Sequence, residues 1–296
     1  MKSWCQCRGR WIAAAGVVAI AVCVRAGAQQ PQTSEGKTGT PTLEEILQRL
    51  QENVDQYQAM VPSFFCDEHV VSTIVPDPRQ ESRVTDATFR LKRVAKPGVE
   101  GETILEESHA VKTMNGRPAT GDAVGGPAFL RGAFSNGLAL VSASQQACMR
   151  YALRPMGKNK GSDPITIQFA SVAARRRPQD CRIEEDVSGR VLIDPESMQV
   201  RHLEFTVPRH FIGTTMYTTF NGLGLNEASI VGRWDVTVEY AAVLLDGKSF
   251  WLPTKISDRM SSSLVRSRWT YDASYSNYHK MEVTSRIVPD SEVPVK

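Results

Sequence analysis

The sequence predicts a mainly β protein of the α+β class, built on a strongly curved antiparallel sheet. Three observations lead to this prediction: an Asp246-Gly247 hairpin, alternation of apolar and polar residues over 85–94, and one amphipathic helix ahead of all the strands. Alternation places apolar side chains on one face of a sheet and leaves the other face to water. The helix must bury its apolar stripe, and we expect it to pack on the sheet.

The hairpin occupies residues 234–256. Asp-Gly between two apolar, β-rich runs is among the strongest short-range signals of a hairpin. Ahead of the turn, Val236, Val238 and Tyr240 alternate with polar residues, so one face of this strand is apolar. After the turn, an aromatic run ends on Pro253, a residue typical of an edge strand or a strand end.

The helix begins at a capping box, in which the Thr42 hydroxyl and the Glu45 carboxylate bind free backbone amides. Apolar residues then recur at three- and four-residue steps, at Leu43, Ile46, Leu47, Leu50, Val54 and Tyr57. Pro62 ends the helix after about five turns.

Further strands, about ten or eleven in all, are expected after the helix. Besides the 234–256 hairpin, they fall at 64–75, 85–94, 103–114, 149–153, 165–170, 189–208 (a hairpin about Asp194-Pro195), 269–275 and 278–288. Residues 117–147 are Gly-rich yet apolar, which predicts a loop and short helices packed over the sheet, either as a core crossover or as a mobile lid. Residues 209–233 are a second candidate for rim or lid material.

The start of the chain predicts export. Residues 1–28 contain bases but no acid. Within them, an apolar run of 14 residues from Trp11 to Val24 is followed by Ala26-Gly27-Ala28. This is the pattern of a secretory signal peptide cleaved near Ala28. The alternative is an uncleaved anchor, but the run is short for a bilayer of about 30 Å. A flexible linker at 29–41, a single β domain at 42–288 and a disordered tail at 289–296 complete the predicted organisation of a periplasmic or secreted protein.

Charge argues against a nucleic-acid partner. The chain has 35 Lys and Arg residues and 32 Asp and Glu residues. The signal peptide holds four of the bases and no acid, so the mature chain has 31 bases against 32 acids, a net charge of −1. A near-neutral chain lacks the electrostatic footprint of a nucleic-acid-binding protein. The one basic run, Arg175-Arg176-Arg177, is interpreted as a solvated loop.

Three cysteines remain after the signal peptide: Cys66, Cys148 and Cys181. An oxidising compartment favours one pair, and Cys148–Cys181 is the preferred choice because it tethers a Gly-, Lys- and Arg-rich segment. Such a loop closure contributes about 3–4 kcal/mol in the chain-entropy model. Cys66 is then a small buried hydrophobic residue.

The sequence shows no motif of catalysis, and we expect no catalytic residue, metal site or cofactor. The mature chain contains no G-x-S-x-G, H-E-x-x-H, P-loop or C-x-x-C motif. Asp67-Glu68-His69 is acidic, but neighbours on a strand point to opposite faces and cannot bind one ion together. The histidines are interpreted as surface or satisfied core residues.

An apolar concave face must be filled by side chains, by the helix or by a bound apolar ligand. The residues expected on this face, which are also the candidate ligand-binding residues, are Phe89, Leu91, Leu203, Phe205, Val238, Tyr240 and Tyr271.

Three motifs in order resemble a group of uncharacterised secreted proteins of soil bacteria. They are Val61-Pro62-Ser63-Phe64-Phe65-Cys66, Gly189–Glu196, and Trp234–Tyr240 followed by Asp246-Gly247-Lys248 and Trp251-Leu252-Pro253. This group resembles the LolA-like fold of outer-membrane lipoprotein carriers, a half-open β-barrel whose mouth is plugged by helices. The resemblance implies handling of an apolar ligand or a lipoprotein in the periplasm, and it supplies no catalytic residue. The 117–147 segment would correspond to the helical lid.

The leading hypothesis is therefore a non-enzymatic protein that binds a lipid or another apolar ligand in a half-barrel cavity. The first alternative is an interaction or sensor module of the cell envelope with a protein partner. The second is a hydrolase of an unrecognised type, whose Asp, Glu or His residues would converge only in space.

Overall fold

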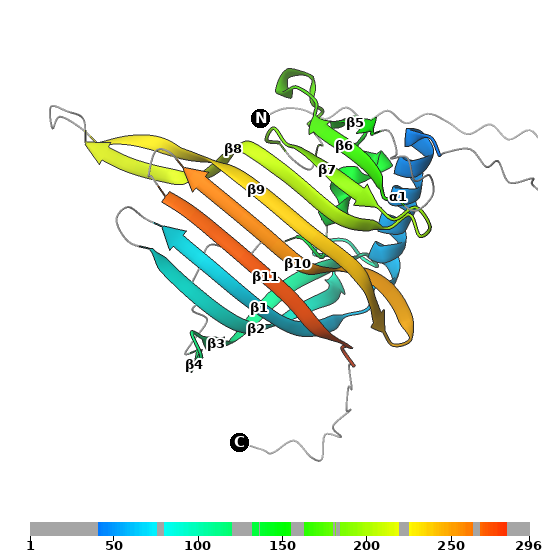
Figure 1. Ribbon diagram of the computed structural model, residues 1–296, viewed down its shortest axis with the longest axis horizontal. Coiled ribbons are helices and arrows are strands. Elements are labelled where there is room, and N and C mark those ends of the chain that lie inside the picture. The colour runs from blue at the N-terminus through cyan, green and yellow to red at the C-terminus, as the bar shows by residue number, and fades with distance from the viewer. Residues whose placement is uncertain are drawn as a thin grey trace, which may run out of the picture. The chain divides into compact units, whose positions relative to one another are not determined.

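One antiparallel sheet of eleven strands organises the described part of the chain (Figure 1). The strand order is β4-β3-β2-β1-β11-β10-β9-β8-β7-β6-β5, so two meanders meet where β1 pairs with β11. The strands are β1 (Phe64–Val75), β2 (Glu81–Ala95), β3 (Thr103–Met114), β4 (Arg117–Pro118), β5 (Met149–Leu153), β6 (Ile165–Ser171), β7 (Ser188–Ile193), β8 (Val200–Thr218), β9 (Leu225–Leu245), β10 (Lys248–Ser262) and β11 (Ser267–Lys280). The edge strands β4 and β5 do not pair, which confirms an open antiparallel sheet in a mainly β protein.

The structure is a computed structural model that describes residues 41–75, 80–119, 132–135, 137–154, 163–179, 181, 184–218, 225–262 and 267–282. The predictions of a signal peptide at 1–28 and of a tail at 289–296 lie outside the described residues, as do nearly all of the linker at 29–41 and a large part of the 117–147 segment. Among the described residues, no helix combines the length and the apolar character needed to cross a membrane.

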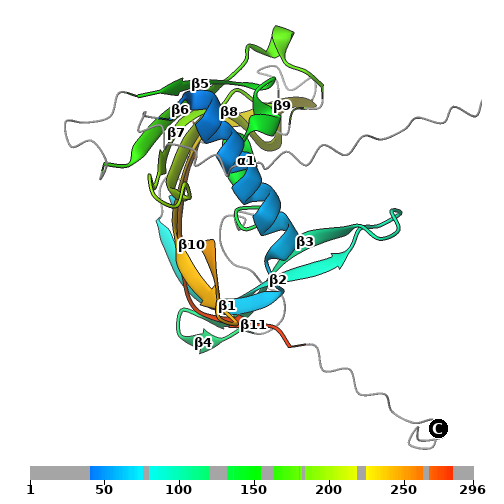
Figure 2. The same ribbon diagram turned by 90° about the vertical axis from the view of Figure 1, so that its right-hand side faces the viewer.

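Helix α1 (Leu43–Met60) lies on the concave side of the curved sheet (Figure 2). The predicted capping box is present, because Thr42 accepts a hydrogen bond from the Glu45 amide and Glu45 accepts one from the Thr42 amide. Ile46, Leu47 and Leu50 are buried against the sheet. The apolar stripe of the helix therefore packs on the apolar face of the alternating strands, as the sequence predicts.

The other end of α1 is fixed to the sheet by a guanidinium group. Arg93 of β2 donates hydrogen bonds to the carbonyl oxygens of Gln58, at 2.8 Å, and of Val61, at 3.0 Å. These carbonyls belong to the end of a helix, where no amide of the helix itself remains to bind them. A cation here also interacts favourably with the helix dipole.

The prediction of rim or lid material at 209–233 was wrong for the described part of that segment. Residues 209–218 extend β8 and residues 225–233 extend β9, and their pairing continues out to Thr218 and Leu225. Two register irregularities, between Val207 and His210 and between Phe211 and Gly213, let the strand pair continue where the alternation of the sequence is lost.

Two strand ends were also predicted in the wrong place. Residues 269–275 and 278–280 belong to one strand, β11, which carries a bulge where Asn277 has a φ of 55°. Residues 283–288 of the predicted last strand lie outside the described residues. Pro253 lies inside β10 instead of at its end, at a register shift and ahead of Lys255, where the pairing with β11 begins. A proline fits there because that end of β10 pairs only with β9.

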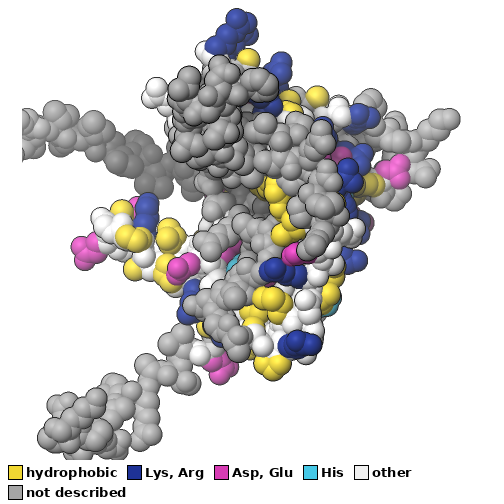
Figure 3. All heavy atoms as spheres, turned by 90° about the vertical axis from the view of Figure 1, so that its left-hand side faces the viewer, with side chains coloured by type: hydrophobic (Ala, Val, Ile, Leu, Met, Phe, Trp, Pro, Cys, Tyr) yellow, Lys and Arg dark blue, Asp and Glu magenta, His cyan; other side chains and the backbone are white. Residues whose placement is uncertain are grey.

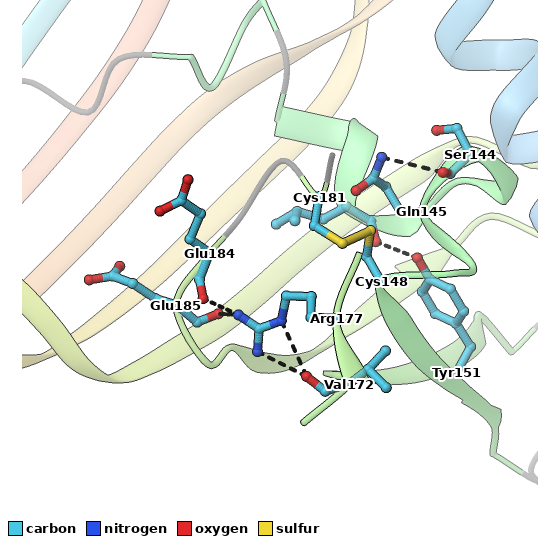
Figure 4. The surroundings of a disulfide bond; sticks show 10 residues. Ser144, Gln145, Cys148, Tyr151, Val172, Arg177, Cys181, Glu184 and Glu185 are labelled. Carbon is cyan, nitrogen blue, oxygen red and sulfur yellow. Dashed lines mark hydrogen bonds between the residues drawn. A yellow bond between two sulfur atoms is a disulfide. The ribbon is translucent and has the colours of Figure 1, made fainter. Parts of the chain in front are cut away.

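A disulfide joins Cys148 and Cys181, the pair favoured from the sequence, with Cα atoms 5.7 Å apart (Figure 4). The interpretation of 175–177 as solvated was wrong for Arg177. Its side chain is nearly buried and donates hydrogen bonds to the carbonyl oxygens of Val172, Glu184 and Glu185. This guanidinium therefore binds together carbonyl groups from both ends of the loop between β6 and β7.

Cross-strand polar pairs cover the outer face of the sheet. Arg190 binds Glu204 at 2.6 Å, and His202 binds Glu239 at 2.7 Å. The outer face of these strands is thus the wet face that the alternation predicts. On the side of the molecule drawn in Figure 3, a quarter turn from the view of Figure 1, basic and acidic side chains also lie among hydrophobic ones.

Gly189 in β7 lies where the chain leaves no room for a side chain. A Cβ atom at this position would lie 2.1 Å from the Glu204 carbonyl oxygen and 2.7 Å from Cζ of Phe169. We expect Gly189→Ala to lower the free energy of unfolding by about 3 kcal/mol, because backbone atoms must move to admit the methyl group. Ser188→Ala, at the exposed neighbouring position, is the control for urea denaturation, and equal stability of the two variants would contradict this account of the close packing at Gly189.

Candidate functional site

The concave face carries an aromatic cluster around Phe134. The ring of Phe134 stacks on Phe89 of β2 at 4.3 Å between centroids and meets Tyr275 of β11 edge-on at 4.9 Å. Phe64 packs against both Phe89 and Phe134, at 6.2 and 6.1 Å. Phe134 comes from the Gly-rich segment at 117–147, so part of that segment fills the concave face.

One carboxylate holds this part of the segment in place. Glu107 of β3 accepts hydrogen bonds from the backbone amides of Gly132 at 2.8 Å, Phe134 at 3.0 Å and Ser135 at 2.7 Å. Hydrogen bonds to an ionised carboxylate are stronger than those between neutral groups. We call residues 132–135, with the adjoining short helices η1 (Gly137–Val141) and η2 (Ala143–Gln145), the cover segment.

Helix α1 binds the same segment from its other side. The Tyr57 hydroxyl donates a hydrogen bond to the carbonyl oxygen of Phe134 at 2.7 Å, and the Gln58 amide donates one to the carbonyl of Ser135. Gln51 accepts a hydrogen bond from the amide of Ser144 at 2.9 Å. The helix and the cover segment therefore form one layer over the concave face.

This layer leaves two adjoining pockets beside the β9–β10 hairpin, which we together call the groove. An inner pocket of about 90 Å³ and an outer pocket of about 300 Å³ share three wall residues, Tyr57, Leu138 and Trp251. The inner pocket is further lined by Gln51, Val54, Asp55, Gln58, Ala133, Phe134, Ser135, Gly137, Ser144, Tyr240 and Pro253. The outer pocket is further lined by Asn53, Gln56, Met60, Gln199, Lys248, Ser249 and Phe250.

Tyr240 of β9 reaches the inner pocket from the floor of the sheet. Only 6% of this residue is exposed, and its hydroxyl has no hydrogen-bond partner among the described residues. Gly137 of η1 faces it, since a Cβ atom there would lie 3.1 Å from the hydroxyl oxygen. Burial, and then the charge of Glu107, raise the pKa of Tyr240 well above its ordinary value of 10.0, so the hydroxyl keeps its proton.

A second polar group on the concave face, the Glu68–His109 pair, is buried away from solvent. Glu68 of β1 binds Nδ1 of His109 at 2.7 Å and accepts a hydrogen bond from the Tyr271 hydroxyl at 3.3 Å. The side chains of Glu68 and His109 are 0% and 6% exposed. His69 points to the outer face, where it binds Asp86 at 2.7 Å, so Asp67-Glu68-His69 is divided between the faces as expected. Within the described ranges, no group of three His, Cys, Asp or Glu side chains could hold a metal ion.

Asp258 of β10 is a third inward polar group. It is buried and accepts a hydrogen bond from Nε1 of Trp234 at 2.6 Å. Burial raises the pKa of Asp258 from 3.8 to about 6, even though the bond from Trp234 lowers it. This carboxyl group therefore titrates closer to neutral pH than an ordinary aspartate.

The seven predicted inner-face residues all belong to the concave core or pack against it. They differ in burial and in whether they line a pocket. Phe89, Leu91, Leu203, Val238 and Tyr271 are almost fully buried, and Phe205 is half-buried beside Trp234. Tyr240 alone among the seven lines the inner or the outer pocket.

Sequence reasoning missed Glu107, Phe134, Tyr57 and Trp251 as groove or cover residues. A usable signal existed for Glu107. It shares a strand face with Leu105 and His109, so a carboxylate stands at a position that faces inward. The long-range partners of Phe134 and Tyr57 have no such local signal.

No protein-family model matches the sequence, and neither does a curated protein. Among solved structures, it is similar to a LolA superfamily protein from Nitrosomonas europaea, at 14% identity and a TM-score of 0.31, over 83% of this chain and 96% of that one. It is also similar to an outer membrane lipoprotein-sorting protein domain from Vibrio parahaemolyticus, at 11% identity and a TM-score of 0.32, over 78% and 90% of the chains. A DUF1329 family protein from Desulfovibrio piger matches at 12% identity and a TM-score of 0.35, over 80% and 92%. The first of these structures is of the LolA superfamily, which the motifs of this chain also resemble.

The Glu107 interaction can be tested by hydrogen exchange. Glu107→Gln keeps the shape of the side chain but turns one acceptor oxygen into an amide, which cannot bind a backbone N–H. We expect a loss of about 1–2 kcal/mol in the free energy of unfolding and faster exchange at the amide of Gly132, because Gln keeps one acceptor oxygen for Phe134 and Ser135, which share Oε1, and turns an NH2 group toward Gly132. Glu106→Gln, on the exposed face of the same strand, is the matched control. Unchanged exchange in Glu107→Gln would show that the carboxylate does not hold the segment.

Asp258 predicts a pH dependence of stability. Because its folded-state pKa of about 6 lies above the ordinary 3.8, its stabilising contribution is complete below about pH 4 and is lost as the pH rises through about 6. Asp258→Asn keeps an acceptor for Trp234 and cannot ionise. Its stability relative to wild type should rise by about 2–3 kcal/mol between about pH 4 and pH 7.5, as followed by urea denaturation. Asp272→Asn controls for loss of a carboxylate from the neighbouring strand, and a pH-independent difference between Asp258→Asn and wild type would contradict the prediction.

Proposed function

We propose that this protein is a non-enzymatic binding protein that holds a lipid or another apolar molecule in the groove between α1 and the β9–β10 hairpin. The observation that carries the proposal is the groove itself. The cover segment and α1 fill the aromatic side of the concave face but leave an apolar opening at Trp251 and Leu138.

The shape and lining of the groove support an elongated apolar ligand. The outer pocket, at about 300 Å³, is at the lower end of the range of about 300–1,000 Å³ that is usual for small-molecule sites. Met60, Phe250 and Trp251 give it apolar walls, while Asn53, Gln56 and Lys248 are among its polar lining residues. The smaller inner pocket adjoins it at Tyr57, Leu138 and Trp251, so we expect the occupant to enter by one end.

The compartment proposed for this function is the periplasm or the cell exterior. The Cys148–Cys181 disulfide supports an oxidising environment. The signal peptide predicted at 1–28 supplies the route there. Lipids and acyl chains are abundant in an envelope, and a half-covered sheet can shield them from water.

The absence of an enzymatic role is part of the proposal. The Glu68–His109 pair is the described carboxylate and imidazole pair buried on the concave face, and both side chains are sealed from solvent. A general acid or base must come within hydrogen-bond reach of its substrate. A sealed pair serves the hydrogen bonding of the core instead.

Uptake of lipid from vesicles tests the proposal. Mature protein is incubated with vesicles of phosphatidylethanolamine and phosphatidylglycerol, separated from them, and weighed by native mass spectrometry. We expect a lipid adduct on the wild-type protein and its loss in Leu138→Trp, because the larger ring fills the wall shared by the two pockets.

Leu244→Ser is the matched control for this experiment. Leu244 is the most exposed large hydrophobic residue of the described chain, at 72%, and it does not line the groove. Its variant should keep the adduct. A wild-type protein without an adduct, or equal uptake by Leu138→Trp, would contradict the proposed function.

A further inference from the structure

We propose that the Tyr240 hydroxyl is the recognition group of the groove, and that it selects apolar ligands with a neutral hydrogen-bond acceptor, such as an ester or amide carbonyl, at the end that enters the inner pocket. This inference rests on the proposed function, because it assumes that an apolar molecule occupies the groove. It adds to that function the chemical class of the ligand and the residue that binds the ligand's polar end.

The first argument is that this hydroxyl lacks an acceptor. Other inward tyrosines of the described chain donate to protein oxygens: Tyr57 to Phe134, Tyr151 to Leu140, Tyr278 to Pro253 and Tyr271 to Glu68. Tyr240 is more buried than Tyr57, Tyr151 and Tyr278, yet it has no partner in the described part of the chain. Buried hydroxyls are nearly always hydrogen-bonded, and an orphan at the wall of a pocket indicates a partner that enters the pocket.

The second argument concerns charge. Asp55 lines the inner pocket, and the Glu107 carboxylate lies close enough to raise the pKa of Tyr240. Among the described residues, no Lys or Arg side chain lines this pocket, whereas Lys248 lines the outer one. An anionic end group would therefore meet the Asp55 carboxylate in the lining of this pocket. An ammonium group is attracted by that carboxylate, but it has no lone pair to accept the phenolic proton and leaves the Tyr240 hydroxyl without an acceptor. A neutral carbonyl satisfies the hydroxyl without either cost.

The third argument is size. The inner pocket, at about 90 Å³, is smaller than the engineered cavity of about 150 Å³ that binds benzene. It admits a carbonyl group with a few carbon atoms, while a longer chain must extend past Trp251 into the outer pocket. Gly137 keeps this end open, because a Cβ atom there would lie 3.1 Å from the Tyr240 hydroxyl.

Three probes with the same eight-carbon chain length separate the possibilities: N-methyloctanamide, octanoate and octylammonium. Their affinities for the mature protein are measured by isothermal titration calorimetry. We expect wild type to bind the amide about tenfold more tightly than either ion. Tyr240→Phe should weaken amide binding by about five- to tenfold, which is the loss expected for one hydrogen bond. It should leave octanoate binding unchanged.

Two further variants separate a loss of ligand binding from a loss of stability. Tyr151→Phe removes a hydroxyl that already has a protein acceptor, outside the groove, so it should lower the urea midpoint and leave amide affinity unchanged. Tyr240→Phe loses only an unpartnered hydroxyl, so its urea midpoint should not fall. Gly137→Ala places a methyl group against Tyr240 and should also abolish the preference for the amide.

The outcomes distinguish this inference from the proposed function. Amide binding that is equal in wild type and Tyr240→Phe, or octanoate binding as tight as the amide, would overturn the role of Tyr240 while the groove remains a lipid site. If the wild-type protein takes up neither the probes nor vesicle lipid, the proposed function fails and the inference fails with it.

Discussion

Three backbone amides converge on one carboxylate, that of Glu107, and the arrangement over the concave face depends on this interaction. It fixes the turn at 132–135, which sets Phe134 onto Phe89. The same turn presents the carbonyl oxygens that α1 binds through Tyr57 and Gln58. Without Glu107, three amides would lose a charged acceptor and the aromatic ring would lose its anchor. The packing of α1 and the filling of the core are thus coupled at one side chain.

That coupling divides the concave face into two parts. Toward β1, β2 and β3 the face is closed: aromatic rings pack together, and Glu68, His109 and Tyr271 satisfy one another away from solvent. Toward the β9–β10 hairpin, the cover segment stops short and the groove remains. The proposed ligand site therefore lies on the hairpin side, beside Tyr240, whose hydroxyl has no hydrogen-bond partner among the described residues.

Local sequence patterns predicted most of the fold. The capping box at Thr42 and the strands at 64–75, 103–114 and 149–153 follow from short-range chemistry that tertiary contacts did not override. The extension of β8 and β9 through 209–233 did not follow from the sequence, since pairing with a neighbour can continue a strand where alternation fails. The site was predicted only at Tyr240. Glu107 and Phe134 are 27 residues apart in the chain, and their contact is set by tertiary structure that no spacing reveals.

The central claim is that an apolar ligand occupies the groove beside the β9–β10 hairpin. A crystal structure of the protein with an eight-carbon amide brominated at its far end tests this most directly, because anomalous scattering locates the bromine atom without reference to a prior pose. The account predicts a bromine peak in the outer pocket, between Met60 and Trp251, with the amide directed toward Tyr240. A peak on the outer face of the sheet, or no peak in a crystal grown with saturating ligand, would contradict it.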